Sequence, residues 1–178
     1  ESSGDFRRIR INRCTFERSR GLALETVDGG VIEDVVATNL TLREITTAPI
    51  FLRLGARLRA PEGAAPGAIR KVVIRDVTAE GILPDYAALI MGLPGHPIED
   101  VTLENVRLVY DGGGTEADAA RQPPELEDAY PEPSMFGRTP AFGLWARHVR
   151  GVRLTGFSAA TIAPDARPET RFEDVTLV

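Results

Sequence analysis

The chain has 178 residues, 43% of them hydrophobic, and its 26 acidic and 21 basic side chains give a formal net charge of −5. This length predicts one domain, and the mixture of apolar and charged residues excludes disorder by composition. The acidic balance argues against a nucleic-acid binder, no apolar run suits a membrane span or a signal peptide, and one cysteine excludes an internal disulfide.

The first predicted element, residues 6–16, begins a repeat. Its apolar residues Phe6, Ile9, Ile11, Cys14 and Phe16 stand at offsets 0, 3, 5, 8 and 10. The same offsets are apolar in copies that begin at residues 32, 69, 98 and 149, and a shortened copy begins at residue 172. These starts are 26, 37, 29, 51 and 23 residues apart, which indicates a unit of about 23 to 29 residues with insertions in two units.

Each copy is predicted to form a strand, a one-residue bend and a second strand. Offsets 3 and 5 alternate as a strand does, and so do offsets 8 and 10, but the parity changes between the two pairs. Offset 7 lies at the change and holds Asn39, Asp76, Asn105 and Gly156, with Arg13 in the first copy. Asn, Asp and Gly tolerate left-handed backbone, so this position is expected to bend.

A further short strand is predicted after most copies, at residues 21–26, 49–54, 88–91 and 142–147. Three short strands in each unit predict an all-β, right-handed parallel β-helix, a solenoid of about six stacked rungs around a continuous apolar core. A β-sandwich is the structural alternative, because it also has short strands at regular spacing. The repeated bend inside one apolar motif favours the β-helix.

Two stretches interrupt the repeat and are predicted to be loop insertions. Residues 56–68 are rich in Gly and Pro, and residues 111–141 begin Asp-Gly-Gly-Gly-Thr and contain Tyr-Pro-Glu-Pro-Ser-Met-Phe-Gly. A loop as long as the second is usually functional or disordered, and its aromatic residues favour packing on the solenoid. Residues 116–121 are expected to form a short helical turn. We interpret residues 1–178 as a single solenoid segment.

The residues around the first short strand resemble a known family. Residues 20–26 (Arg-Gly-Leu-Ala-Leu-Glu-Thr), followed by Gly-Gly and Val-Ile-Glu-Asp-Val, resemble the Arg-Gly-Ile-Arg-Ile-Lys-Thr run, Gly-Gly and I-x-N-V strand of glycoside hydrolase family 28. The opening Glu-Ser-Ser-Gly is similar to the end of the family's Gly-Ser-Glu-Ser/Thr-x-Gly stretch. Residues 94–101 and the Tyr-Pro-Glu-Pro run are similar to a bacterial branch of it. The resemblance covers the whole chain and implies a pectin-lyase-like solenoid.

This resemblance implies inverting hydrolysis of polygalacturonan or rhamnogalacturonan by carboxylates about 6.5–9.5 Å apart. The family's catalytic aspartates lie in Asn-Thr-Asp and Asp-Asp motifs, supported by a Gly-His-Gly histidine, and none of these motifs occurs here. We therefore expect the C-terminal portion of such an enzyme, without its N-terminal rungs, catalytic residues, cofactor or metal. The implied partner is a pectic oligosaccharide or polysaccharide, with no nucleic acid or membrane, and the implied protein is an extracellular or periplasmic monomer.

The resemblance also implies candidate substrate-binding residues. Glu25 stands where the family has a lysine that binds the substrate carboxylate, so we expect a neutral sugar there, preferably rhamnose. Arg53 is expected on the same outward face one rung further, where it either binds a uronate or pairs with Glu25. Phe51 and Trp145 either stack on sugar rings or pack, under residues 56–68 and residues 111–141 respectively, and packing is favoured for both.

Other features carry less functional information. His96 and His148 are isolated and do not indicate a metal site, and Cys14 is a core position of the repeat. The run at residues 165–168, Asp-Ala-Arg-Pro, has no role that the sequence explains. A non-catalytic β-helix that binds carbohydrate or acts as an adhesin is the alternative function. A pectate lyase is a weaker alternative, since it needs calcium and the sequence shows no clustered acidic ligands.

Overall fold

The computed structural model describes residues 4–59 and 65–178, and its regular structure is nearly all β. The strands are β1 (Phe6–Asn12), β2 (Thr15–Glu17), β3 (Leu22–Thr26), β4 (Val31–Arg43), β5 (Ile50–Leu54), β6 (Ala68–Ile82), β7 (Ala88–Met91), β8 (Ile98–Tyr110), β9 (Leu144–Thr161) and β10 (Thr170–Leu177). The predicted helical turn is confirmed as α1 (Glu116–Ala119), and a 3-10 turn spans Pro133–Phe136.

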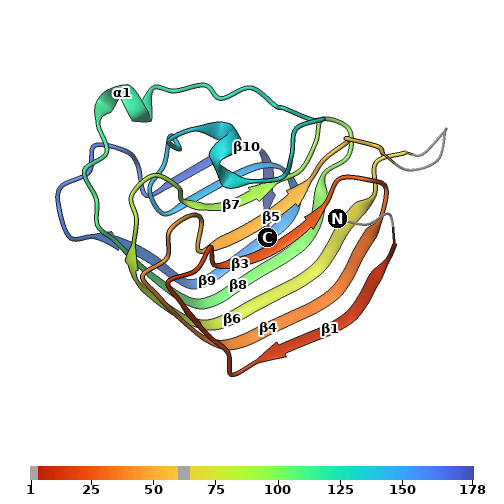
Figure 1. Cartoon of the computed structure of the whole chain (residues 1–178), viewed down its shortest axis with the longest axis horizontal. Helices are drawn as coiled ribbons and strands as arrows, with labels where there is room; N and C mark the ends of the chain where they lie inside the picture. The colour runs from red at the N-terminus through yellow and green to blue at the C-terminus, as the bar shows by residue number, and fades with distance from the viewer. Residues whose placement is uncertain (1–3, 60–64) are drawn as a thin grey trace.

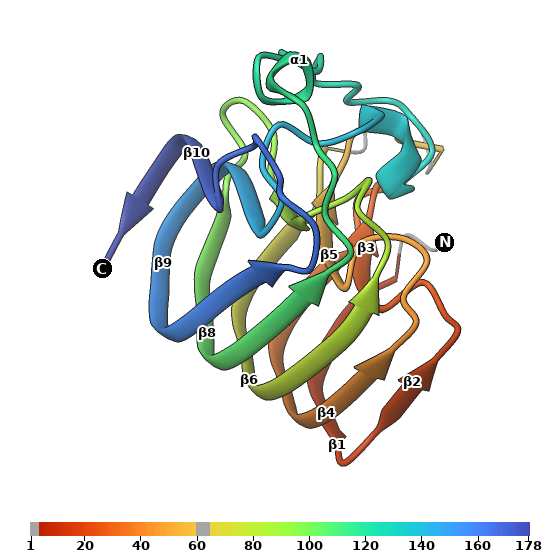
Figure 2. The ribbon, with the colours of Figure 1, turned by 90° about the vertical axis from the view of Figure 1, so that its left-hand side faces the viewer.

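The strands form one parallel sheet that is curled around the core. Its order is β1-β4-β6-β8-β9-β7-β5-β3, with β2 beside β4 and β10 beside β9. The order turns back at β9, because the first residues of β9 pair with β7 and its later residues pair with β8. The short strands β3, β5 and β7 therefore lie across the core from the long strands β4, β6 and β8 (Figures 1 and 2). A sandwich of antiparallel sheets does not agree with this pairing.

The predicted bends are confirmed inside the long strands. Asn39 of β4, Asp76 of β6 and Asn105 of β8 have φ values of 56°, 54° and 50°, and Gly156 of β9 has φ 63°. The amide of Asn105 also donates a hydrogen bond of 3.1 Å to Asp76 on the neighbouring strand. A second bend that was not predicted lies five residues earlier in these strands, at Asp34, Lys71, Asp100 and Gly151. Left-handed residues at these two positions of each long strand allow it to curve around the core.

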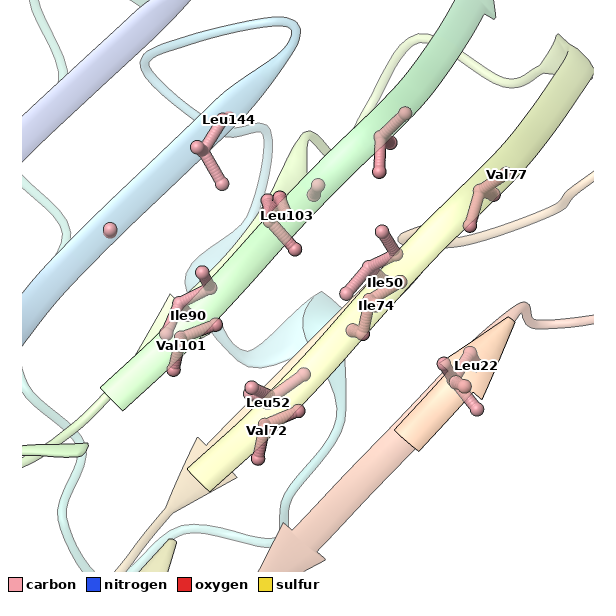
Figure 3. Packing of buried hydrophobic residues seen from close by; sticks show 14 of the residues in the cluster. Leu22, Ile50, Leu52, Val72, Ile74, Val77, Ile90, Val101, Leu103 and Leu144 are labelled. Atoms are coloured by element: carbon pink, nitrogen blue, oxygen red, sulfur yellow. The ribbon is translucent and has the colours of Figure 1, made fainter. Parts of the chain in front are cut away.

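The predicted repeat is also confirmed by the register of the sheet. Val35 of β4 pairs with Val72 of β6, Val72 pairs with Val101 of β8, and Val101 pairs with Val152 of β9. These four valines are completely buried. They belong to one apolar cluster with leucines and isoleucines of the short strands, as Figure 3 shows for Leu22, Ile50, Leu52 and Ile90. Equivalent residues of successive copies thus stack at the same depth of the core.

The register predicted for the last copy is wrong. Phe172 of β10 pairs with Ala146, and Val175 pairs with Val149, so the copy begins at Val175 rather than at Phe172. The reason is that two pairs of apolar positions have the same three-residue spacing. Phe172 and Val175 flank a left-handed residue, Asp174, just as Ala146 and Val149 flank His148. The spacing alone cannot distinguish this corner from the start of a copy.

The predicted short strands are confirmed as β3, β5, β7 and the first residues of β9. Of the first predicted insertion, residues 56–59 and 65–67 are outside any strand, and residues 60–64 lie outside the described part of the chain. The opening residues 1–3, which contributed to the family resemblance, also lie outside it. The second insertion is described throughout, and it determines which part of the sheet can contact a ligand.

Candidate functional site

The short strands carry two columns of side chains on their outer side, which faces away from the core. The first column is Ala23, Phe51, Leu89 and Trp145, and the second is Glu25, Arg53, Met91 and Arg147. Side chains of one strand that are two residues apart lie on the same face, so both columns belong to one surface. The structure thus places all four predicted substrate-binding residues on this surface.

Residues 111–143, which we call the covering segment, lie over most of this surface. Phe136 packs edge-on against Trp145, with the ring centroids 5.3 Å apart and an interplanar angle of 74°. Phe51, Leu89 and Met91 belong to the same apolar cluster, and Phe51 and Trp145 are no more than 1% exposed. Trp145 is therefore packed under this segment, as the packing alternative predicted. Phe51 is packed under the same segment, in a cluster that includes none of the described residues of the range 56–68.

Arg53 is also covered, and its side chain is 1% exposed. Its Nη2 donates hydrogen bonds to the carbonyl oxygens of Glu125 and Leu126, at 3.1 and 2.9 Å. Its guanidinium lies 5.6 Å from the centre of the Phe136 ring. Burial lowers the pKa of Arg53 to about 10, although the nearby carboxylates of Glu125 and Glu127 oppose the shift. Arg53 cannot reach a ligand unless the covering segment moves away.

A cleft remains open at the β3 edge of the surface. It encloses about 380 Å³, counting its open mouth, and is lined by Arg20, Ala23, Glu25, Thr47, Phe51 and residues 130–133. Glu25 is exposed there. Arg20 forms an ion pair with Glu132, so the cleft lies between β3 and the covering segment. Of the four predicted residues, Glu25 and Phe51 line this cleft, whereas Arg53 and Trp145 do not.

Tyr130 is a cleft residue that the sequence analysis missed. It is 58% exposed, and the guanidinium of Arg57 lies 5.7 Å from the centre of its ring. An exposed aromatic ring next to carboxylates provides an apolar surface and hydrogen-bond acceptors in one place, which suits a sugar ring and its hydroxyls. The sequence does show the Tyr-Pro-Glu-Pro run that contains Tyr130. The repeat of apolar positions, however, does not predict where a residue of a loop lies.

A group of charged side chains connects the covering segment to β9 and β10. Arg147 donates hydrogen bonds to the carbonyl oxygen of Pro123 at 3.0 Å, to Glu125 at 3.1 Å and to Glu173 at 2.8 Å. His148 Nδ1 lies 2.8 Å from Asp174. Hydrogen bonds from His148 and then Arg150 lower the pKa of the Asp174 carboxyl. These contacts are between protein groups and explain the position of His148 without a ligand.

Asp165 and Arg167 hold both ends of the covering segment, a role that the sequence analysis did not identify. Both side chains are fully buried, and Arg167 Nη2 lies 2.7 Å from the Asp165 carboxylate. Asp165 accepts from the Gly114 amide at 2.9 Å, and Arg167 donates to the Thr139 carbonyl at 3.2 Å. A Cβ atom at Gly114 would lie 2.2 Å from Arg167 Nε, so this approach requires glycine.

Among residues 4–59 and 65–178, no group of three or more His, Cys, Asp or Glu side chains is arranged to hold a metal ion. Within the same residues, no helix has the length and apolar character needed to cross a membrane. Cys14 is partly buried and packs against the core. Comparisons with protein-family models, curated proteins and solved structures find no match for the chain.

Proposed function

We propose that the chain is part of a right-handed parallel β-helix that binds a pectic polysaccharide outside the cell or in the periplasm, as the substrate-binding portion of a family 28-like glycoside hydrolase. The sequence has no Asp-Asp or Asn-Thr-Asp motif, so in this proposal its residues bind substrate and supply no catalytic carboxylate. The observation that carries the proposal is the open cleft around Glu25, on the same outer surface as the other predicted residues.

The parallel register supports the β-helix. Short strand β3 is followed by long strand β4, β5 by β6, and β7 by β8, and each unit pairs with the next in the same register. A connection that leads from one parallel strand to the next is right-handed in nearly all proteins. Stacking of such units buries a continuous core and leaves one side chain of each column per unit on the outside.

The chemistry of the cleft supports a neutral sugar next to Glu25. A carboxylate accepts charge-assisted hydrogen bonds from sugar hydroxyls and repels the carboxylate of a uronate. The exposed ring of Tyr130 provides an apolar surface against which the methyl group of a deoxy sugar such as rhamnose can pack.

Calorimetric titration with oligosaccharides tests this proposal. We expect rhamnose-terminated rhamnogalacturonan oligosaccharides to bind more tightly than oligogalacturonates of equal length. Substitution Glu25→Lys is expected to reverse this order, by about tenfold in relative affinity, because it replaces repulsion of a uronate with attraction. Tyr130→Ala is expected to weaken binding of both sugars. Measurement at low and high salt would separate the charge effect from the packing effect.

Glu17→Lys is the matched control, since Glu17 is also an exposed strand carboxylate but lies on β2, outside the cleft. It should leave the order of the two affinities unchanged. Failure of the unsubstituted chain to bind either oligosaccharide at millimolar concentration would contradict the proposal. An unchanged order in Glu25→Lys would show that Glu25 does not select the sugar.

A non-catalytic carbohydrate-binding β-helix is a second candidate, favoured by the covering segment. Phe136 and its neighbours occupy much of the outer surface along which a long polysaccharide would lie in a β-helix hydrolase. Release of reducing ends from rhamnogalacturonan by the natural full-length protein separates the two candidates. Hydrolysis supports the glycosidase, whereas oligosaccharide binding without hydrolysis supports the binding module.

A further inference from the structure

We propose that residues 122–137, which we call the strap, form a lid that opens at its tip while the covering segment stays attached at its base. The strap lies over β5 and β7, where it covers Phe51, Arg53 and Trp145 (Figures 1 and 2). Opening would extend the cleft at Glu25 along the outer surface of the short strands. The use of that surface for a saccharide rests on the proposed function, whereas the opening itself does not.

The base and the tip are held by contacts of different kinds. At the base, the side chains of Asp165 and Arg167 are completely buried and hold Gly114 and Thr139. At the tip, the carboxylate of Glu125 is 35% exposed where it meets Arg147 and lies 3.3 Å from His148 Nε2. Water competes for an exposed ion pair but not for a dry one, so the tip separates more easily than the base.

One arginine beneath the strap, Arg53, favours opening. Arg53 is 1% exposed and is held by two carbonyl oxygens, and its Nε has no acceptor among the described residues. Burial of a guanidinium without full hydrogen bonding costs free energy, which hydration returns when the strap opens.

The apolar contacts of the strap favour closure. Phe136 is 2% exposed and packs on Trp145, and Leu126 and Met135 pack on the same cluster. The strap is otherwise poor in regular structure, with one 3-10 turn and buried prolines at positions 123, 131 and 133. Segments with few regular hydrogen bonds open locally at low free-energy cost. Contacts that favour closure and contacts that favour opening together make a two-state lid, and a change at one contact can shift the population of the open state.

Trp145 provides a direct reporter, because it is the single tryptophan of the chain and lies under Phe136. Substitution Glu125→Gln removes the charge that holds Arg147 and His148 while it keeps the shape of the side chain. We expect it to raise the population of the open lid about tenfold, because hydrogen bonds to charged groups are stronger than neutral ones. Acrylamide quenching of Trp145 fluorescence should increase, and the strap amides should exchange hydrogen faster, whereas those of β8 should not.

Asp128→Asn is the matched control, an exposed acid-to-amide change in the same strap. It should change neither the quenching of Trp145 nor the exchange of the strap. The lid would be refuted if quenching of Trp145 were the same in Glu125→Gln, Asp128→Asn and the unsubstituted chain. Exchange that rises equally in the strap and in β8 would also refute it, because the chain would then unfold as a whole. Neither readout uses a sugar, so the lid and the proposed function can fail separately.

Discussion

The inner and outer sides of β5 and β7 are both buried, but by different means. The inner residues Leu52 and Ile90 pack on long strands that repeat in register with them. The outer residues Phe51 and Trp145 are covered by a segment that has no counterpart elsewhere in the repeat. In β5 all five residues are buried, so its two sides cannot be distinguished by exposure. Burial on both sides explains why β5 and β7 are apolar apart from Arg53.

This difference determines how each side contributes to stability and function. The inner side belongs to a core in which every unit supports the next, so a defect there affects the whole sheet. The outer side depends on one segment, which charged side chains attach at Arg20, Arg147 and Arg167, so it can separate while the core stays intact. Substitutions on the inner side should therefore affect unfolding of the whole sheet, whereas substitutions on the outer side should affect local opening of the segment. The changes in free energy should also differ in size.

The largest effect is expected at the buried base of the outer side. Asp165→Asn leaves the Arg167 guanidinium buried without a counter-charge and should lower the free energy of unfolding by about 3 to 5 kcal/mol, measured by urea denaturation at pH 7. Asp128→Asn, an exposed acid-to-amide change in the same segment, provides the control and should change stability little. An Asp165→Asn protein as stable as the unsubstituted chain would contradict the anchoring role of Asp165.

Acid should act on the same anchor. Burial raises the pKa of Asp165, but hydrogen bonds from the Arg167 side chain and from the amides of Arg167 and Gly114 outweigh it and lower the pKa to about 2. The stabilisation is therefore complete above the unfolded-state pKa, near 4, and is lost as the pH falls through about 2. It amounts to about 2 kcal/mol. Stability measured between pH 4 and 2 should decline less steeply in Asp165→Asn.

The next effect is expected on the inner side. Leu52→Ala removes a fully buried side chain from the core and should lower the free energy of unfolding by about 3 kcal/mol, because the regular sheet cannot close around the cavity. The fluorescence of Trp145 below the transition should not change. Leu83→Ala is the matched control, since Leu83 is 43% exposed, and its expected cost is below about 0.5 kcal/mol.

A smaller effect is expected for the equivalent change on the outer side. Phe136→Ala also removes a buried ring, but the strap can open locally, which limits the cost to the whole fold to about 1 to 2 kcal/mol. The same substitution should increase acrylamide quenching of Trp145 under native conditions. A loss of stability as large as that of Leu52→Ala, without extra quenching, would mean that the two sides form one cooperative core.

The same contrast explains what the sequence could predict. The repeat and its bends follow from local alternation and from residue types such as Asn39 and Asp76, so the strands, their parallel core and the outward position of Glu25 were predictable. The position of the covering segment was not predictable, because the contacts of Phe136 with Trp145 and of Asp165 with Gly114 follow no periodicity of the sequence. The predicted register of β10 was wrong because the pairs Ala146–Val149 and Phe172–Val175 have the same three-residue spacing as the first two positions of a copy. A pattern of apolar residues cannot distinguish the two.

The smallest effect concerns the bends by which the long strands enclose the inner side. Asn105 has φ 50°, and the equivalent position on β9 is a glycine, Gly156, with φ 63°. Asn105→Ala should lower the free energy of unfolding by about 1 kcal/mol more than Asn105→Gly. The reason is that the Cβ atom of alanine disfavours left-handed backbone, whereas glycine has no Cβ atom. Both variants lose the hydrogen bond from the side-chain amide of Asn105 to Asp76, so the difference between their unfolding free energies measures the backbone conformation alone. Equal stability of the two variants in urea denaturation would show that the bend relaxes at no cost, and the long strands would then owe their curvature to packing on the core.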